Sequence, residues 1–252
     1  MKKLGLIAAL AFVLVACQET KKESATTAEV DTAETQKEQT TSSDNQEWEI
    51  LFDGSNLDNF RGYLADEMYP EWTIDGDAMM FTPSEEGGRN IITKDTYTNF
   101  VLSLEWKISE GGNSGIFYGV KEDPKYKEAY QTGPEIQVLD DAKHPDANRG
   151  GKTHRAGALY DMIAPKDGVA NPAGSWNKVV LTINHDNNKG TVVMNDVEMY
   201  SFPTHGTKWE QMIANSKFDG WEGFGAYKTG HIGLQDHSDK VWYRNIKIKR
   251  LD

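Results

Sequence analysis

The chain has 252 residues, of which 38% are hydrophobic and 10% aromatic, so it can bury a sizeable core. An all-β sandwich can use this length in one domain, and one folded domain is the simplest organisation. The formal net charge of −12 at pH 7 argues against a phosphate-binding surface, which needs clustered Lys and Arg, so we expect no nucleic-acid partner.

Residues 1–16 predict a bacterial lipoprotein signal peptide. Lys2 and Lys3 precede the apolar run LGLIAALAFVLV, which is too short for a comfortable membrane span. The run ends in LVAC, where small residues precede Cys17, the only cysteine of the chain. This pattern resembles a lipoprotein signal, in which the cysteine is lipidated and becomes the mature N-terminus. An ordinary secretory signal is the alternative. Either way we expect export to the bacterial cell envelope, without an intrachain disulfide.

Residues 17–47 predict a disordered acidic tether. From residue 18 to residue 47 there is no aromatic residue, glycine or proline, and eight acidic residues stand against three basic ones. Such a segment cannot bury enough surface to offset its conformational entropy. Repulsion between its charges should keep it extended between the lipid on Cys17 and the folded domain.

The folded domain is predicted to span residues 48–252. Turn sequences such as FDGSN, EEGGRN and GGNSG separate short segments rich in β-branched and aromatic residues. In FVLSLEWKIS, residues 100–109, the large apolar residues alternate, which is strand periodicity. Residues 176–202 predict two or three antiparallel strands with turns at NNKG and MNDVEM. GTKWEQMIANS predicts one short helix, and VWYRNIKIKRL predicts the last strand. The expected fold is all-β, a two-sheet antiparallel jelly-roll sandwich.

Several common chemistries lack their sequence motifs. There is no CxxC or HExxH for zinc, no GxSxG elbow and no phosphate-binding glycine loop. The candidates are therefore polar groups scattered over strands and adjoining loops.

The segment EIQVLD, residues 135–140, is the first candidate. Alternation in a strand places Glu135 and Gln137 on one face. The segment resembles the E-x-D-x-x-E signature of laminarinase-like glycosidases, in which Glu135 would be the nucleophile and Asp140 the acid/base, with Gln137 in place of the middle carboxylate. A solvated sheet face explains the same alternation.

Two histidine segments are further candidates. In GLQDH, a strand ends at His237, which could titrate near neutral pH, and at Asp236, which could bind a metal or orient an imidazole. In THRAGALYD, His154 lies near Tyr160 and Asp161. A capped turn and a solvated loop histidine are the structural alternatives.

Two positions have both a structural and a binding interpretation. Arg244, Ile246 and Ile248 stand two residues apart in the last strand, so alternation would place all three on the same face. We therefore expect Arg244 either to pair with a carboxylate in the interior or to bind ligand in a groove. In GGNSGIFYG, Asn113 lies between glycines that allow close backbone approach, as a sugar-binding rim would need. A plain tight turn is the alternative.

Together these segments resemble one family. ILFDGSNLDNFRGY, GGNSGIFYGV, PEIQVLDD, GALYDMIAP, GSWNKVVLTI and HIGLQDHSDKVWYRNIKIKRL are similar, in this order, to the 3-keto-disaccharide hydrolase domain family over residues 49–251. The family usually has an Asn-Gly turn where this chain has Asn195 and Asp196, which leaves the shape of that hairpin open.

The resemblance implies a concanavalin/laminarinase-like jelly roll that cleaves 3-keto-glycosides. A base would remove the proton beside the ketone, the aglycone would be eliminated, and water would add later. This chemistry needs a positioned base and either hydrogen-bond donors or a divalent metal ion to stabilise the enolate. The residues carried over by motif are His237 or His154 as the base, Glu135 and Asp236 with His237 as metal ligands or orienters, and Asn113, Gln137, Tyr160, Gln235 and Arg244 as sugar contacts.

Two other functions fit the same sequence. One is a retaining β-glucanase that uses Glu135 and Asp140. The other is a non-catalytic, lectin-like carbohydrate-binding domain, because jelly rolls host binding as readily as catalysis. The tryptophans that could stack on sugars are Trp72, Trp176, Trp209, Trp221 and Trp242.

Overall fold

The computed structural model describes residues 47–85, 87 and 89–251. The predicted signal peptide, Cys17 and all of the tether except Glu47 lie outside the described residues. Among the residues it describes, no helix is long and apolar enough to cross a membrane.

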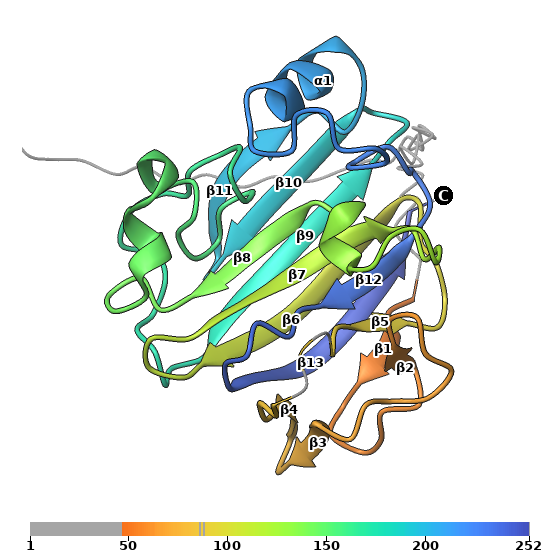
Figure 1. The fold of residues 1–252 in the computed structure, drawn as a ribbon, viewed down its shortest axis with the longest axis vertical. Coiled ribbons are helices and arrows are strands. Elements are labelled where there is room, and N and C mark those ends of the chain that lie inside the picture. The colour runs from red at the N-terminus through yellow and green to blue at the C-terminus, as the bar shows by residue number, and fades with distance from the viewer. Residues whose placement is uncertain (1–46, 86, 88, 252) are drawn as a thin grey trace, which may run out of the picture. The chain divides into compact units, whose positions relative to one another are not determined.

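The described chain forms a sandwich of two antiparallel β-sheets, which confirms the predicted all-β jelly roll (Figure 1). The larger sheet has the order β11-β10-β9-β6-β13-β4-β3, and β1 pairs with β13. Its strands are β1 (Glu49–Phe52), β3 (Trp72–Asp75), β4 (Ala78–Phe81), β6 (Phe100–Ile108), β9 (Asn177–Asn184), β10 (Lys189–Met194), β11 (Val197–Phe202) and β13 (Val241–Arg250). The smaller sheet has the order β2-β5-β12-β7-β8. Its strands are β2 (Phe60–Gly62), β5 (Ile91–Thr93), β7 (Asn113–Val120), β8 (Glu135–Leu139) and β12 (His231–Leu234).

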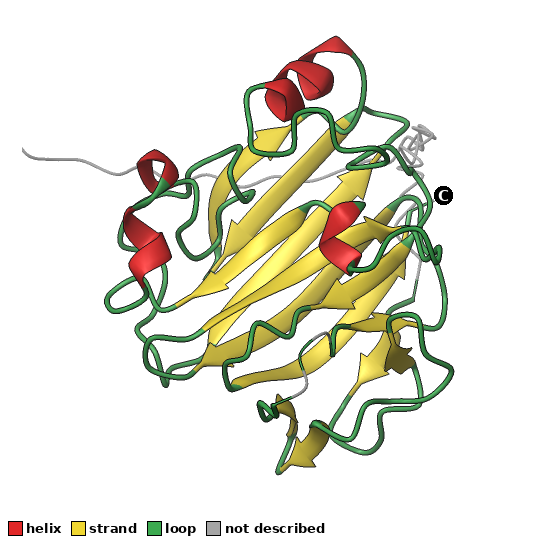
Figure 2. Cartoon of the chain, in the orientation of Figure 1, coloured by secondary structure: helices red, strands yellow, loops and turns green. Residues whose placement is uncertain are grey.

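Short helices lie outside the sheets (Figure 2). They are the α-helix α1 (Thr207–Ala214) and the 3-10 turns η1 (Ala129–Gln131), η2 (Pro145–Asn148) and η3 (Gly150–Lys152). Helix α1 lies within the predicted segment GTKWEQMIANS. It buries Trp209, whose Nε1 donates to the carbonyl of Gly225 at 3.0 Å and whose ring stacks on Phe202.

The core lies between the two sheets. In β6 every second residue from Phe100 to Ile108 is buried, which confirms the strand periodicity predicted from the sequence. In β8, Ile136 and Val138 belong to the same core. Since side chains alternate across a strand, Glu135 and Gln137 must lie on the opposite face of the smaller sheet.

The hairpin between β10 and β11 keeps a two-residue turn although its sequence departs from Asn-Gly. Asn195 and Asp196 both have positive φ, 48° and 64°, the conformation that a type I′ turn requires. The Asn195 amide donates to the Asn177 side chain at 2.8 Å and so ties the turn to β9. The substitution of Asp for Gly is therefore compatible with a tight hairpin.

Arg244 does not face the core, although regular alternation along the last strand predicts that it does. The pairing of β13 with β6 shifts register between Arg244 and Lys247, and Asn245 has a φ of 52°. This bulge places Arg244 on the outer face of the larger sheet while Ile246 enters the core. Its guanidinium donates to Glu105 at 2.8 Å and to Asp77 at 3.0 Å. The prediction of a sugar contact is corrected: Arg244 forms an ion pair, at the surface instead of in the interior.

Candidate active site

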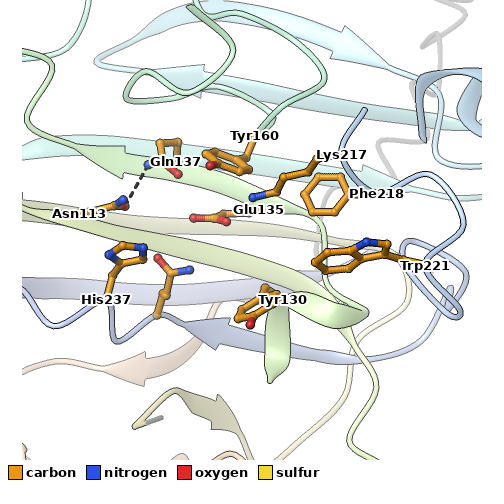
Figure 3. A pocket seen from close by; sticks show the side chains of 10 residues that line it. Asn113, Tyr130, Glu135, Gln137, Tyr160, Lys217, Phe218, Trp221 and His237 are labelled. Atoms are coloured by element: carbon orange, nitrogen blue, oxygen red, sulfur yellow. Dashed lines mark hydrogen bonds between the residues drawn. The ribbon is translucent and has the colours of Figure 1, made fainter. Parts of the chain in front are cut away.

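One pocket lies on the face of the smaller sheet that points away from the core (Figure 3). We call it the main pocket, and its volume is about 320 Å³. Its lining comes from β7, β8, the residues after β12, and the loops around them. The lining residues are Asn113, Tyr130, Glu135, Gln137, Tyr160, Lys217, Phe218, Trp221, Gln235 and His237.

Neighbouring strands place buried amides side by side on the floor of the main pocket. Gly115 of β7 is paired with Gln137 of β8, and the backbone N–H of Gln235 donates to the Gly115 carbonyl at 2.9 Å. The Gln137 Nε2 donates to Asn113 Oδ1 at 3.0 Å. This bond orients the Asn113 amide, so that its own N–H group remains for a ligand.

Gly115 explains how Glu135 fits above this floor. A Cβ at position 115 would collide with the Glu135 carboxylate. The glycine in GGNSGIF is therefore required by the close approach of the Glu135 side chain, whereas the predicted approach of the backbone to a sugar stays a prediction. The adjacent Ser114 points the other way, and its hydroxyl donates to the Gln235 carbonyl at 2.7 Å.

Glu135 is a buried carboxyl without a direct partner. Its residue is only 7% exposed, and no hydrogen bond or ion pair engages its carboxylate among the described residues. The pKa of Glu135 is raised to about 8, chiefly by burial; the nearby Lys217 lowers it and Asp146 raises it by smaller amounts. A carboxyl with this pKa can accept a proton near neutral pH more strongly than an ordinary one.

Lys217 faces Glu135 across the main pocket. It comes from the loop between α1 and β12, and Figure 3 shows its amine directed toward Glu135. Its Nζ lies 4.1 Å from the centroid of the Tyr160 ring. Burial lowers the pKa of Lys217, and Glu135 and Asp161 partly offset this. The two groups are thus poised to exchange protons with a ligand between them.

His154 lies behind the wall of the main pocket, in what we call the histidine cluster: Asp146, His154 and Asp161. Its Nε2 lies 2.6 Å from Asp161 Oδ1, and its Nδ1 lies 3.2 Å from Asp146 Oδ2. Its ring stacks on Tyr160 at 4.3 Å, and the Tyr160 hydroxyl donates to Asp146 at 3.0 Å. Asp161 also accepts the backbone N–H of Lys217 at 2.6 Å. His154 does not line the main pocket, and its ring supports the pocket wall between two carboxylates; its role as the base stays a prediction.

Two predicted carboxylates are occupied by backbone amides. Asp236 accepts the N–H groups of Arg89 and Ser238, each at 2.8 Å, with its two oxygens. Asp140 accepts two backbone N–H groups, at 2.7 and 3.0 Å. Neither residue lines the main pocket. Asp140 therefore cannot act as the acid/base of a glucanase pair, and Asp236 caps a turn.

The predicted metal ligands do not assemble. Glu135 and His237 line the main pocket, but Asp236 does not. In the part of the chain that the structure describes, no three His, Cys, Asp or Glu side chains gather where they could hold a metal ion. Since both oxygens of Asp236 already accept backbone N–H groups, the predicted three-ligand set does not fit a metal ion and is corrected.

Two amide oxygens in the main pocket have no hydrogen-bond partner. They are Oε1 of Gln137 and Oε1 of Gln235, both buried and without a donor in the described residues. Buried polar atoms are nearly always satisfied, so these acceptors call for a ligand or water.

An aromatic wall completes the main pocket. Phe218 meets Trp221 edge-on at 5.2 Å, and Tyr130 lies 6.1 Å from Trp221. Trp221 is 38% exposed at this rim. His237, also exposed, stands at the opposite side of the main pocket, next to Asn113 (Figure 3).

Comparison with known proteins identifies the family. The model of the 3-keto-alpha-glucoside-1,2-lyase-like domain matches residues 47–249. The chain belongs to this family. A 3-keto-disaccharide hydrolase of Bacteroides thetaiotaomicron is 38% identical over 229 residues, which cover 80% of this chain and 78% of that protein. Two crystal structures of proposed glycosyl hydrolases from Parabacteroides distasonis are also similar. The first has a TM-score of 0.74 and 29% identity, covering 81% of this chain and 94% of that one. The second has a TM-score of 0.61 and 26% identity, covering 81% and 100%.

Six residues predicted from the sequence line the main pocket of this 3-keto-alpha-glucoside-1,2-lyase-like domain: Asn113, Glu135, Gln137, Tyr160, Gln235 and His237. Lys217 and Phe218 belong to no motif, and only the fold brings their loop to the sheet. The sequence feature that points to Lys217 and Phe218 is the composition of SKFDGW, which has a lysine among aromatic residues in an otherwise polar loop.

Proposed function

We propose that the chain cleaves glycosides whose sugar carries a ketone at carbon 3. The glycosidic oxygen would leave from carbon 1 after a proton is removed from carbon 2, and water would then add. The family description as 1,2-lyase-like and the activity named for the Bacteroides relative support this proposal. The observation that carries it is Glu135, a buried, unpaired carboxyl of raised pKa on the pocket floor.

Glu135 acts as the base in this proposal. The ketone acidifies the proton on carbon 2, and the Glu135 carboxylate takes that proton. The C–H electron pair forms a double bond between carbons 2 and 3, and the charge moves to the ketone oxygen. A pKa near the working pH makes a carboxylate an effective base for this step.

Asn113 and His237 would hold the ketone oxygen. The Asn113 amide is oriented by Gln137, and His237 stands beside it. Hydrogen bonds from fixed donors in a buried site stabilise negative charge as it develops. Gln137 and Gln235 would accept hydrogen bonds from sugar hydroxyls through their unpartnered oxygens.

Lys217 would act as the acid. When the enolate re-forms the ketone, a double bond forms between carbons 1 and 2 and the bond to the glycosidic oxygen breaks. The Lys217 ammonium lies on the Trp221 side of Glu135 and can protonate that oxygen (Figure 3). A lowered pKa suits a lysine to this role. Addition of water to the unsaturated sugar gives the 3-keto-sugar and regenerates both groups.

The test is a direct activity assay. Purified protein is given a 3-keto-glucoside with a chromogenic leaving group and the matching unoxidised glucoside, each with added divalent cations and with a chelator. We expect release from the keto-substrate alone. Release from the unoxidised glucoside at a similar rate, or no release under any condition, would reject the proposal.

Sugar binding without turnover is a second candidate function. The exposed ring of Trp221 and the unpartnered amide oxygens favour it, since lectin sites combine an aromatic face with hydrogen-bonding groups. Measurable affinity for the keto-sugar with no product would support it over catalysis.

We also propose that lipid on Cys17 anchors the protein in the bacterial cell envelope, facing the periplasm or the cell surface. The LVAC pattern after an apolar run supports this. Cys17→Ser should move the protein from the membrane fraction to the soluble fraction, and an unchanged distribution would contradict the anchor.

A further inference from the structure

Asp161 is the member of the histidine cluster that also contacts the loop of Lys217. Its Oδ1 lies 2.6 Å from His154 Nε2, and its Oδ2 accepts the backbone N–H of Lys217 at 2.6 Å. Lys217 stands 56 positions later in the chain, so this bond joins two separate loops. We propose that Asp161 is a positioning residue for the elimination: it holds Lys217 beside Glu135, and its negative charge stabilises the Lys217 ammonium. This inference rests on the proposed function.

The backbone of Asp161 is in the left-handed conformation, with a φ of 59°. This conformation is unfavourable for most residues, whereas glycine adopts it freely. Aspartate and asparagine tolerate it better than other side chains do. A turn that needed only this shape would favour glycine. The aspartate is therefore explained by the contacts of its carboxylate, which no glycine could make.

Lys217 is held at both ends by one short segment. Lys217 and Asp219 reach solvent, so packing does little to fix this part of the loop. The Asp161 carboxylate accepts the backbone N–H of Lys217, and the ring of Tyr160, the preceding residue, lies 4.1 Å from its Nζ. With both contacts, the amine points toward Glu135 (Figure 3). Misplacement of a catalytic group by about 1 Å can cost about 10²-fold in rate, so this anchoring bears directly on catalysis.

The carboxylate of Asp161 also acts on the charge of Lys217. Burial lowers the pKa of Lys217, and three nearby carboxylates raise it again: Glu135, Asp161 and Asp146. Without the charge of Asp161, the ammonium should therefore lose its proton at lower pH. An acid must still hold its proton at the working pH. The charge of Asp161 thus widens the pH range in which Lys217 can act as an acid.

Two substitutions separate the anchoring from the charge. Asp161→Asn removes only the charge, because asparagine tolerates the positive φ and its oxygen can still accept the Lys217 N–H. Asp161→Gly removes the carboxylate without adding backbone strain. The matched controls are Asp196→Asn and Asp196→Gly. Asp196 also has a positive φ, 64°, and it pairs with Lys178 outside the main pocket.

Kinetics on a 3-keto-glucoside test both roles. Asp161→Gly should lower kcat about tenfold in the wild-type background. In the Lys217→Met background it should cost no more than about twofold, because a residue that acts through Lys217 loses its effect without it. Asp161→Asn should move the falling limb of the pH profile to lower pH and leave the rising limb of Glu135 in place. Both Asp196 variants should match wild type. An equal loss in both backgrounds would overturn the anchoring, and an unmoved falling limb would overturn the role of the charge.

Hydrogen exchange separates this inference from the proposed function, because it needs no substrate. The Lys217 amide should exchange about tenfold faster in Asp161→Gly than in wild type, and within about twofold of wild type in Asp161→Asn. Mass spectrometry of a peptide over residues 215–222 measures it. If wild-type protein turns over no keto-substrate but this protection is lost, the proposed function fails and the anchoring of Lys217 stands. Unchanged protection in Asp161→Gly would overturn the inference even in an active enzyme.

Discussion

The main pocket and the histidine cluster both bury titratable groups beside Tyr160, but they treat these groups in opposite ways. Glu135 in the main pocket has no direct partner among the described residues, and burial raises its pKa to about 8. In the histidine cluster, burial also raises the pKa of Asp146, but the adjacent His154 ring and the hydrogen bond from Tyr160 bring it below its ordinary value. The paired groups of the histidine cluster stabilise the wall of the main pocket, whereas the unpaired carboxyl of Glu135 remains free to act on a ligand.

The strongest test of this contrast is Glu135→Gln. The amide fills the same space but cannot take a proton, so we expect kcat to fall about 10³-fold. Thermal stability should be unchanged or higher at pH 8, because a buried charge is removed. Circular dichroism melts and steady-state kinetics measure the two effects. If the variant loses stability together with activity, Glu135 has a structural role like that of the histidine cluster.

Lys217→Met tests the second proton-transfer group. Loss of the acid should lower kcat about 10²-fold. The wild-type rate should rise with pH through about 8 as Glu135 ionises, and fall at higher pH as Lys217 loses its proton. The variant should keep the rise, moved to higher pH because Lys217 no longer lowers the pKa of Glu135, and lose the fall. If the falling limb persists in the variant, another group supplies the proton.

His154→Ala should act mainly on stability. It leaves Asp146 and Asp161 without their shared partner, at a cost of about 3 kcal/mol. Activity should fall on the order of tenfold, through misplacement of Tyr160 and Lys217. The rising limb of the pH profile should stay at the wild-type position, since Glu135 is intact. Denaturant melts and pH profiles give both results, and a shifted limb with unchanged stability would make His154 the base.

The difference in stability between wild type and Glu135→Gln should depend on pH. The folded pKa of Glu135 is raised from an ordinary 4.5 to about 8, so the folded state holds a proton that the unfolded state releases. Wild-type stability relative to the variant should therefore fall as pH rises from 4.5 to about 8, by at most about 1.4 kcal/mol per unit. Urea unfolding across this range measures it. A flat difference would mean that Glu135 is not buried as a proton-binding group.

Arg244→Met should have the smallest effect. The ion pair with Glu105 and Asp77 lies half-exposed on the outer face of the larger sheet. Its removal should cost about 1 kcal/mol. We expect kcat/KM to stay within about twofold of wild type. A larger loss in activity would indicate that Arg244 contacts the ligand.

The sequence predicted those parts of the fold that depend on local pattern. Alternation of apolar residues predicted β6, and the segments that resemble the family contain strands of both sheets. Alternation predicted the wrong face for Arg244, because the sequence of one strand does not show the bulge at Asn245. Such a bulge depends on how β13 pairs with β6, which is a property of two strands.

The site was predictable only where its residues lie in one strand. Glu135 and Gln137 share a face of β8, which their spacing predicts. The role of His154 depends on Asp146 and Asp161, whose approach is set by loops without periodicity. Lys217 reaches the sheet from a distant loop, so no local pattern contained it.

The central claim is that Glu135 removes the proton from carbon 2 of a 3-keto-sugar. The most direct measurement is deuterium incorporation when the reaction runs in D₂O. Elimination and hydration should place deuterium on carbon 2 of the released sugar, above the level of the sugar incubated without enzyme, and Glu135→Gln should abolish this. Release of sugar that keeps its original hydrogen at carbon 2, at a rate that Glu135→Gln leaves unchanged, would contradict the account, because direct displacement at carbon 1 never breaks that bond.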